Sequence, residues 1–155
     1  MAGVMTDTKV RRLLLLTDDE FHAEVLGTYM RRDSVEVERV ATADEAARGI
    51  AAGANGVLVD LAKRGVSADA IMTLSGRAQR CEIPMMILSA QPRRDLNDFA
   101  AVVRATDVVS KTEAMTAIAA RIRMCLMTPL RPAARQSAAP RSQSQPPVGW
   151  ALSAA

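Results

Sequence analysis

The sequence predicts an α/β fold in which five short strands form a doubly wound parallel sheet accompanied by five helices. The first observation is that short apolar runs alternate with segments of helical periodicity from residue 10 to residue 126. The second is that three runs, LLLL, VLV and MMIL, are apolar throughout, as strands covered on both faces are. The third is the length of 155 residues, which suits one domain with a sizeable core.

Each predicted strand is a short apolar run that precedes or follows a helical pattern. The five runs are residues 10–16, 35–41, 57–61, 85–88 and 108–109. Only the second, which contains VEVERV, alternates apolar and polar residues, so we expect it at an edge of the sheet.

The predicted helices are amphipathic, and two have clear start signals. The second helix opens on a capping box, Thr42 with Glu45 three residues later, and stops near Gly53. The third begins at Ser67. The apolar positions of the other faces are Phe21, Val25, Leu26 and Tyr29 in the first helix, Ile71, Met72 and Leu74 in the third, Leu96, Phe99 and Val103 in the fourth, and Met115, Ile118, Ile122 and Leu126 in the fifth.

The composition predicts a cytoplasmic domain over residues 9–127 and a flexible tail over residues 128–155. The longest apolar runs are too short to span a bilayer, and residues 1–12 lack a secretory signal, so no membrane contact is expected. The tail holds five of the seven prolines and no acid. Its three arginines account for the net charge of +3, so direct nucleic-acid binding by the neutral domain is not expected.

Four scattered residues receive simple interpretations. Cys81 and Cys125 lack CxxC spacing, which predicts two reduced, partly buried thiols rather than zinc ligands or a disulfide. His22 is interpreted as a solvated helix residue rather than a phosphotransfer histidine, because the strand pattern argues against a helical bundle. Trp150 is either without a role or the anchor of a docking peptide.

Polar side chains gather where the predicted strands end. In an open parallel sheet, ligands bind at the carboxyl ends of the strands, where the strand order reverses. We therefore expect carboxylates, a hydroxyl and an ammonium to converge on one crevice. The residues concerned are Asp18, Asp19 and Glu20 after the first strand, Asp60 at the third, Ser89 at the fourth, and Ser110 and Lys111 at the fifth.

This set of side chains predicts magnesium and phosphoryl chemistry. Carboxylates packed closely repel one another unless a cation lies between them, and their hard oxygens suit Mg²⁺. Asp60 would attack a phosphoryl group to form an aspartyl phosphate, whose oxygens Ser89 and Lys111 would bind. Taken singly, Asp18 or Thr17 would be a helix cap, Ser89 a loop hydroxyl and Lys111 a solvated charge. Their joint placement favours the site.

These motifs resemble the receiver domain of two-component response regulators, the CheY-like superfamily. That family has an acidic pair after the first strand, a phosphoacceptor Asp after the third, Ser or Thr with Ala after the fourth, and Lys after the fifth. The corresponding stretches here are TDDE, VLVDL, ILSA and VVSK. The resemblance covers about residues 9–127 and implies a flavodoxin-like sheet of order 2-1-3-4-5.

The resemblance also implies a function. Asp60 would accept a phosphoryl group from a sensor histidine kinase or a histidine phosphotransfer protein in a Mg²⁺-dependent reaction. Ser89 and Lys111 would then signal to the face formed by the fourth helix, fifth strand and fifth helix, which a downstream protein or a second copy of the chain would read. The residues implied to hold Mg²⁺ are Asp18, Asp19, Asp60 and, through its backbone carbonyl, Ala62.

The sequence departs from the family pattern at several positions. Lys63 and Arg64 follow the acceptor where a Met-Pro pair is usual, so we expect another loop shape. Thr112 replaces the proline after the lysine and removes the usual cis peptide, and Val108 replaces the aromatic switch residue. Ala62 cannot orient a hydrolytic water, which predicts slow loss of phosphate.

The first functional hypothesis is a stand-alone receiver that is a signalling domain rather than an enzyme, beyond its own phosphorylation and dephosphorylation. The tail is too short for an output domain. The alternative is a degenerate receiver-like adaptor that binds partners without phosphorylation. A haloacid-dehalogenase-like phosphatase is disfavoured because no second Asp stands two residues after Asp60, and a dinucleotide-binding fold because no G-x-G-x-x-G follows a strand.

Overall fold

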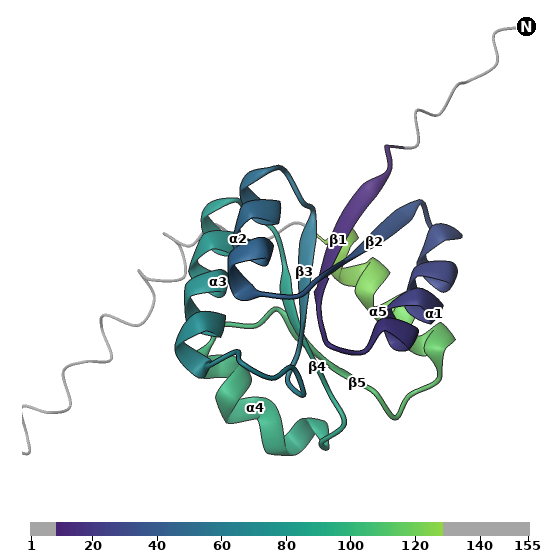
Figure 1. Cartoon of the computed structure of the whole chain (residues 1–155). Helices are drawn as coiled ribbons and strands as arrows, with labels where there is room; N and C mark the ends of the chain where they lie inside the picture. Colours follow the sequence, from purple (N-terminus) through teal and green to yellow (C-terminus); the bar gives the residue numbers. More distant parts are fainter. Residues whose placement is uncertain (1–8, 129–155) are drawn as a thin grey trace, which may run out of the picture.

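The computed structural model describes residues 9–128 and places five parallel strands in one sheet of order β2-β1-β3-β4-β5 (Figure 1). This confirms the predicted fold class and strand order. In chain order the elements are β1 Arg11–Leu16, α1 Glu20–Arg31, β2 Val35–Val40, α2 Ala43–Ala51, β3 Gly56–Asp60, α3 Ala68–Arg80, β4 Met85–Ser89, α4 Arg93–Val102, β5 Asp107–Ser110 and α5 Met115–Met127.

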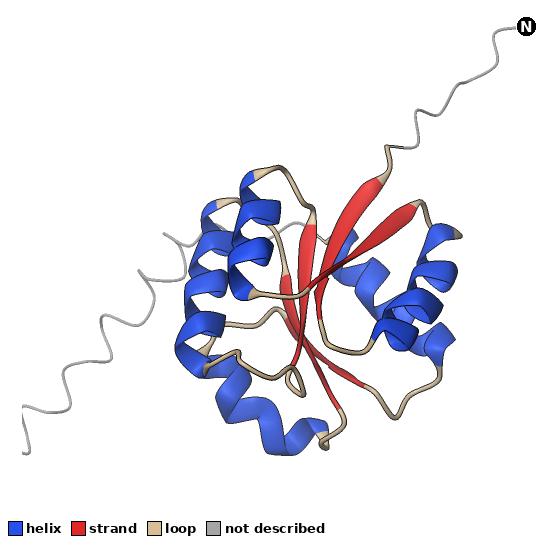
Figure 2. Cartoon of the chain, viewed as in Figure 1, coloured by secondary structure: helices blue, strands red, loops and turns tan. Residues whose placement is uncertain are grey.

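The helices cover both faces of the sheet, with α1 and α5 on one side and α2, α3 and α4 on the other (Figures 1 and 2). Successive residues of a strand point to opposite faces, so the four leucines of β1 divide between two cores. Leu14 and Leu16 lie in the core under α2 and α3, whereas Leu13 and Leu15 lie in the core under α1 and α5. This two-sided burial is the reason that the run LLLL is apolar without alternation.

The strand register brings the candidate residues to one edge of the sheet. Leu16 of β1 is paired with Val59 of β3, so the residues that follow them, Thr17 and Asp60, are neighbours. The chain leaves β1 toward β2 on one side and returns to β3 on the other, which makes this edge the topological switch point. In Figure 1 it is the lower edge of the sheet.

The predicted helix starts are confirmed. The Thr42 hydroxyl accepts from Glu45 N at 3.1 Å, and the Ser67 hydroxyl accepts from Ala70 N at 3.1 Å. Gly53, with φ of +100°, follows the last residues of α2 in the left-handed conformation that glycine adopts readily.

The prediction for the apolar face of α1 was wrong at Phe21. The buried positions of α1 are Ala23, Leu26, Gly27 and Met30, which follow helical spacing. Phe21 stands two positions before Ala23, about 200° away around a helix with 3.6 residues per turn, and its side chain is 76% exposed. Spacing alone linked Phe21 to Val25 and missed that Ala and Gly form the contact face.

Several other sequence interpretations can be compared with the structure. β2 lies at an edge of the sheet, as predicted, and β5 forms the other edge. Cys81 is exposed rather than partly buried, whereas Cys125 is half-buried. Within residues 9–128 no helix has the length and apolar character needed to cross a membrane. The predicted flexibility of the tail and the role of Trp150 fall on residues 129–155, outside the described residues.

Candidate functional site

Asp60 is the centre of the candidate site. It is the last residue of β3, and only 3% of its surface is exposed. Its Oδ1 atom lies 2.7 Å from the Nζ atom of Lys111 and accepts from Ala62 N at 2.9 Å. The structure therefore brings Asp60 and Lys111 together, as the sequence predicts, and leaves the carboxylate with an ammonium and an amide on one oxygen.

Thr17 supplies the partner of the other Asp60 oxygen. Its hydroxyl donates to Asp60 Oδ2 at 2.7 Å and accepts from Asp19 N at 3.1 Å, and the residue is 1% exposed. The sequence indicated Thr17 only as a possible helix cap and not as a partner of Asp60. The available signal was its position, because Thr17 directly follows the buried residues 13–16 and lies next to Asp60 in the register of β1 and β3.

Asp18 is bound to the loop that follows β3. Its Oδ1 atom forms an ion pair with Lys63 Nζ at 3.0 Å, and its Oδ2 accepts from Arg64 N at 3.1 Å. The Arg64 N–H, and after it the Lys63 ammonium, hold the pKa of Asp18 below its usual value. Asp18 is thus ionised, and each of its oxygens has a donor from one segment, residues 63–64.

Asp19 and Glu20 have contacts of their own outside the Asp60 cluster. Asp19 is the N-cap of α1, and its Oδ1 accepts from His22 N at 2.9 Å. The Glu20 carboxylate pairs with Arg39 of β2 at 3.1 Å. The sequence suggested the capping role for Asp18 or Thr17, and in the structure Asp19 has it.

Ser89 and Lys111 lie beside each other at the ends of β4 and β5. Lys111 N donates to the Ser89 carbonyl at 2.8 Å, and the Ser89 hydroxyl accepts from Gln91 N at 3.1 Å. Among the described residues, that hydroxyl donates no hydrogen bond, so its proton is available. The following turn is held by Ser110 and Thr112, whose hydroxyls lie 2.7 Å apart, and the described residues contain no cis peptide, as expected from Thr112.

The arrangement does not fit the Mg²⁺ site predicted from the sequence. Mg²⁺ requires oxygen ligands in near-octahedral positions. The Asp18 carboxylate is bound by the Lys63 ammonium and the Arg64 N–H, and Asp19 caps α1. The Asp60 carboxylate is bound by the Lys111 ammonium, the Ala62 N–H and the Thr17 hydroxyl. Within residues 9–128 no three His, Cys, Asp or Glu side chains converge as a metal site. The Mg²⁺ set, with the Ala62 carbonyl, stays a prediction that this geometry does not support.

His22 is not the solvated residue that the sequence suggested. Both ring nitrogens are buried, and within the described chain neither has a hydrogen-bond partner. A phosphotransfer histidine must expose a ring nitrogen to its partner, so the structure offers no support for that role either.

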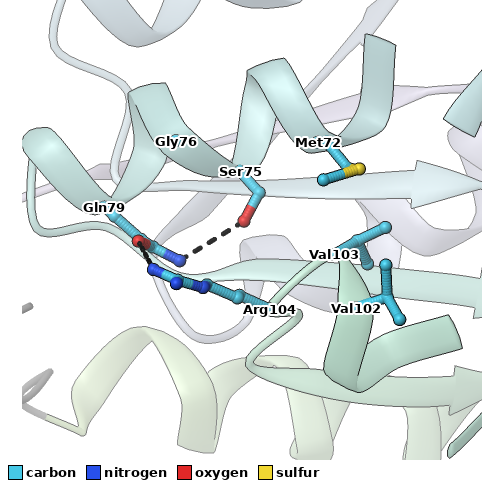
Figure 3. A pocket seen from close by; sticks show the side chains of 7 residues that line it. All are labelled: Met72, Ser75, Gly76, Gln79, Val102, Val103 and Arg104. Carbon is cyan, nitrogen blue, oxygen red and sulfur yellow. Dashed lines mark hydrogen bonds between the residues drawn. The ribbon is translucent and has the colours of Figure 1, made fainter. Parts of the chain in front are cut away.

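A separate pocket, whose lining does not include Asp60, lies between α3 and the end of α4 (Figure 3). Met72 and Ser75 of α3 lie on one side of it, and Val102 and Val103 lie on the other. Gln79 closes one end: its side-chain amide donates to the Ser75 hydroxyl and accepts from Arg104. Its volume is about 270 Å³. The lining carries no carboxylate, thiol or histidine, and so offers no group for general acid–base or metal chemistry.

Comparison with solved structures identifies the fold. A putative response regulator from Chloroflexus aurantiacus is 24% identical, with a TM-score of 0.65 and coverage of 77% of this chain and 100% of the other. A response regulator from Thermotoga maritima is 16% identical, with a TM-score of 0.66 and coverage of 77% and 100%. The chain has the fold of a response regulator receiver domain. Chemotaxis protein CheY4 of Vibrio cholerae, 14% identical over 76% of this chain and 99% of its own, agrees with a TM-score of 0.66.

The sequence matches no protein-family model and no curated protein. The receiver fold explains the common position of Asp60, Ser89 and Lys111 at the carboxyl edge of the sheet.

Proposed function

We propose that the chain is a receiver module in which Asp60 accepts a phosphoryl group and which passes this signal on by protein contact. The observation that carries the proposal is the Asp60 carboxylate, 3% exposed and 2.7 Å from the Lys111 ammonium at the switch point of the sheet. A carboxylate there is held in one orientation, and a cation stands ready for added negative charge.

The transfer would use a donor with a labile phosphorus–nitrogen bond, such as the phosphohistidine of a sensor kinase or phosphotransfer protein. An Asp60 oxygen attacks phosphorus, the P–N bond breaks, and its electron pair returns to the imidazole. Three donors would stabilise the negative charge of the aspartyl phosphate. They are the Lys111 ammonium and the Ala62 N–H, which now contact Asp60 Oδ1, and the Ser89 hydroxyl. No step is assigned to Mg²⁺, because Asp18 and Asp60 each already have a lysine ammonium beside them.

The downstream partner is proposed to bind the face formed by α4, β5 and α5. Asp107 at the start of β5 links the three elements through ion pairs to Arg93 of α4 and Arg121 of α5. Next to them Met124 is 66% exposed beside a hollow of about 660 Å³. Lys111 directly follows β5, so a shift of its ammonium toward a new phosphoryl group would act on the strand that carries this network.

The second candidate is an adaptor with the receiver fold that binds partners without phosphorylation. It is favoured by the fact that both Asp60 oxygens already have partners within the chain. Such a domain would present the same α4, β5 and α5 face at all times.

Phosphodonor labelling separates the two candidates. The full chain is incubated with acetyl phosphate or phosphoramidate, with MgCl₂ or with EDTA, and its intact mass is measured. We expect one added phosphoryl group on the wild type and on Asp69→Asn, an exposed acid on α3, and none on Asp60→Asn. No incorporation under either condition would reject phosphoacceptance and leave the adaptor.

A further inference from the structure

The loop after β3 carries a lysine whose charged end is turned inward. The Lys63 side chain is 11% exposed, although the Asp18 side chain that it pairs with is 52% exposed. Its ammonium lies 3.0 Å from Asp18 Oδ1 and donates to the Arg64 carbonyl at 2.8 Å. Lysine ammonium groups normally reach for water, so this inward placement calls for a reason.

The backbone around Lys63 holds it in this place. Lys63 N donates to the Asp60 carbonyl at 3.0 Å, which forms a tight turn directly after the strand. The next N–H, that of Arg64, donates to Asp18 Oδ2 at 3.1 Å. The ammonium and this amide together occupy both oxygens of the Asp18 carboxylate.

The charges of the site are balanced within the chain. Asp60 is paired with Lys111, and Asp18 is paired with Lys63. These two carboxylates therefore each have a cation from within the chain. We propose that Lys63 is a built-in counter-ion that takes the place of a divalent cation beside Asp18, so that the chain binds Mg²⁺ weakly. The consequence that Asp60 is phosphorylated without Mg²⁺ rests on the proposed function.

The physical reason is competition for the same oxygens. Mg²⁺ binds oxygens at about 2.0–2.1 Å and does not tolerate a second cation in its first shell. To bind, it would have to displace the ammonium from Asp18 Oδ1 and the Arg64 amide from Oδ2, and then remain beside the displaced positive charge. A lysine on a chain pays no such displacement cost, because its position is set by the fold.

The test is a direct titration of the full chain with MgCl₂ by isothermal calorimetry, repeated with Mn²⁺ by the loss of its free electron paramagnetic resonance signal. Lys63→Met keeps most of the length of the side chain and removes the charge. Arg80→Met removes one positive charge at the other end of α3 and serves as the matched control. Lys63→Arg restores a cation, and Lys63→Met combined with Asp18→Asn replaces the carboxylate that Mg²⁺ would use by a neutral amide.

We expect Lys63→Met to bind Mg²⁺ at least about tenfold more tightly than the wild type, because a neighbouring positive charge has been removed. Arg80→Met and Lys63→Arg should remain as weak as the wild type, and the double variant should lose the gain. Equal Mg²⁺ affinity of the wild type and Lys63→Met would overturn the proposal, as would a gain in Arg80→Met of the same size. A variant that unfolds is detected by circular dichroism, and Lys63→Gln then replaces it.

This titration contains no phosphodonor, so its outcome is independent of whether Asp60 is phosphorylated. If Lys63→Met gains Mg²⁺ affinity while the wild type takes up no phosphoryl group, the counter-ion proposal stands and the phosphoacceptor proposal fails. If the wild type binds Mg²⁺ as tightly as Lys63→Met and is still labelled at Asp60, the reverse holds.

Discussion

Loss of Lys111 should be the most damaging charge removal at this site. Asp60 is 3% exposed, whereas the Lys111 side chain is 21% exposed. Lys111→Met therefore leaves a buried carboxylate with only the Ala62 amide and the Thr17 hydroxyl as donors. Removing one partner of a buried ion pair costs about 3–5 kcal/mol. Because two donors remain, we expect the lower value, about 3 kcal/mol of unfolding free energy.

The opposite change should cost much less. Asp60→Asn leaves an ammonium that can turn toward water. The expected loss of unfolding free energy is about 1 kcal/mol, because a hydrogen bond to a charged carboxylate becomes a weaker one to a neutral amide. In Lys111→Met combined with Asp60→Asn no buried charge remains, and the loss should be about 2 kcal/mol. The two single losses exceed that of the double variant by about 2 kcal/mol, which is the coupling energy of the pair.

The assay is urea unfolding followed by far-ultraviolet circular dichroism at pH 7 for the four proteins of this cycle. With a urea dependence of about 2 kcal/mol per molar, Lys111→Met should lower the midpoint by about 1.5 M. The reasoning is refuted if Lys111→Met is no less stable than Asp60→Asn, or if the two single effects simply add.

Three further predictions concern neighbouring groups. Thr17→Val removes the hydroxyl that donates to Asp60 Oδ2 and should lower the free energy of unfolding, measured with urea, by about 1–2 kcal/mol. Thr17→Ser keeps the hydroxyl and should retain most of the stability. Burial raises the pKa of Cys125 to about 11, so at pH 8 only about one Cys125 thiol in 10³ is ionised. Ellman's reagent should therefore modify exposed Cys81 quickly and Cys125 only after denaturation. Fast modification of both thiols in the folded protein would contradict this. His22→Leu removes two buried unpartnered nitrogens and should raise stability by about 1 kcal/mol, measured as a higher Tm; a lower Tm would show that the ring has a partner in solution.

The fold could be predicted because its strongest signals are local. Runs such as LLLL and VLV are buried on both sides, and that pattern alone indicates strands of a parallel sheet. The caps at Thr42 and Ser67 are equally local, since each hydroxyl bonds to an amide three residues later. Phe21 was misassigned because an apolar spacing does not state which of two faces packs, and α1 packs through Ala23 and Gly27.

The candidate site could be predicted in position but not in its pairings. The ends of parallel strands meet at one edge, so Asp60, Ser89 and Lys111 had to be close. Which acid faces Asp60 depends on where β1 ends relative to its neighbour, and a shift by one residue turns a side chain to the other face. The structure ends β1 so that the Thr17 hydroxyl binds Asp60, whereas Asp18 binds the loop after β3 and Asp19 caps α1.

The same dependence on loop shape decides how the acids are neutralised. From the sequence, Asp18, Asp19 and Asp60 read as three negative charges needing a metal, because Lys63 and Arg64 were taken only as a sign of another loop shape. In the folded chain one acid serves a helix N-terminus, and the other two each have a lysine within 3.0 Å. A count of acids at strand ends therefore indicates a metal site only after the lysines and arginines of the adjoining loops have been placed, and in this chain Lys63 changes the conclusion.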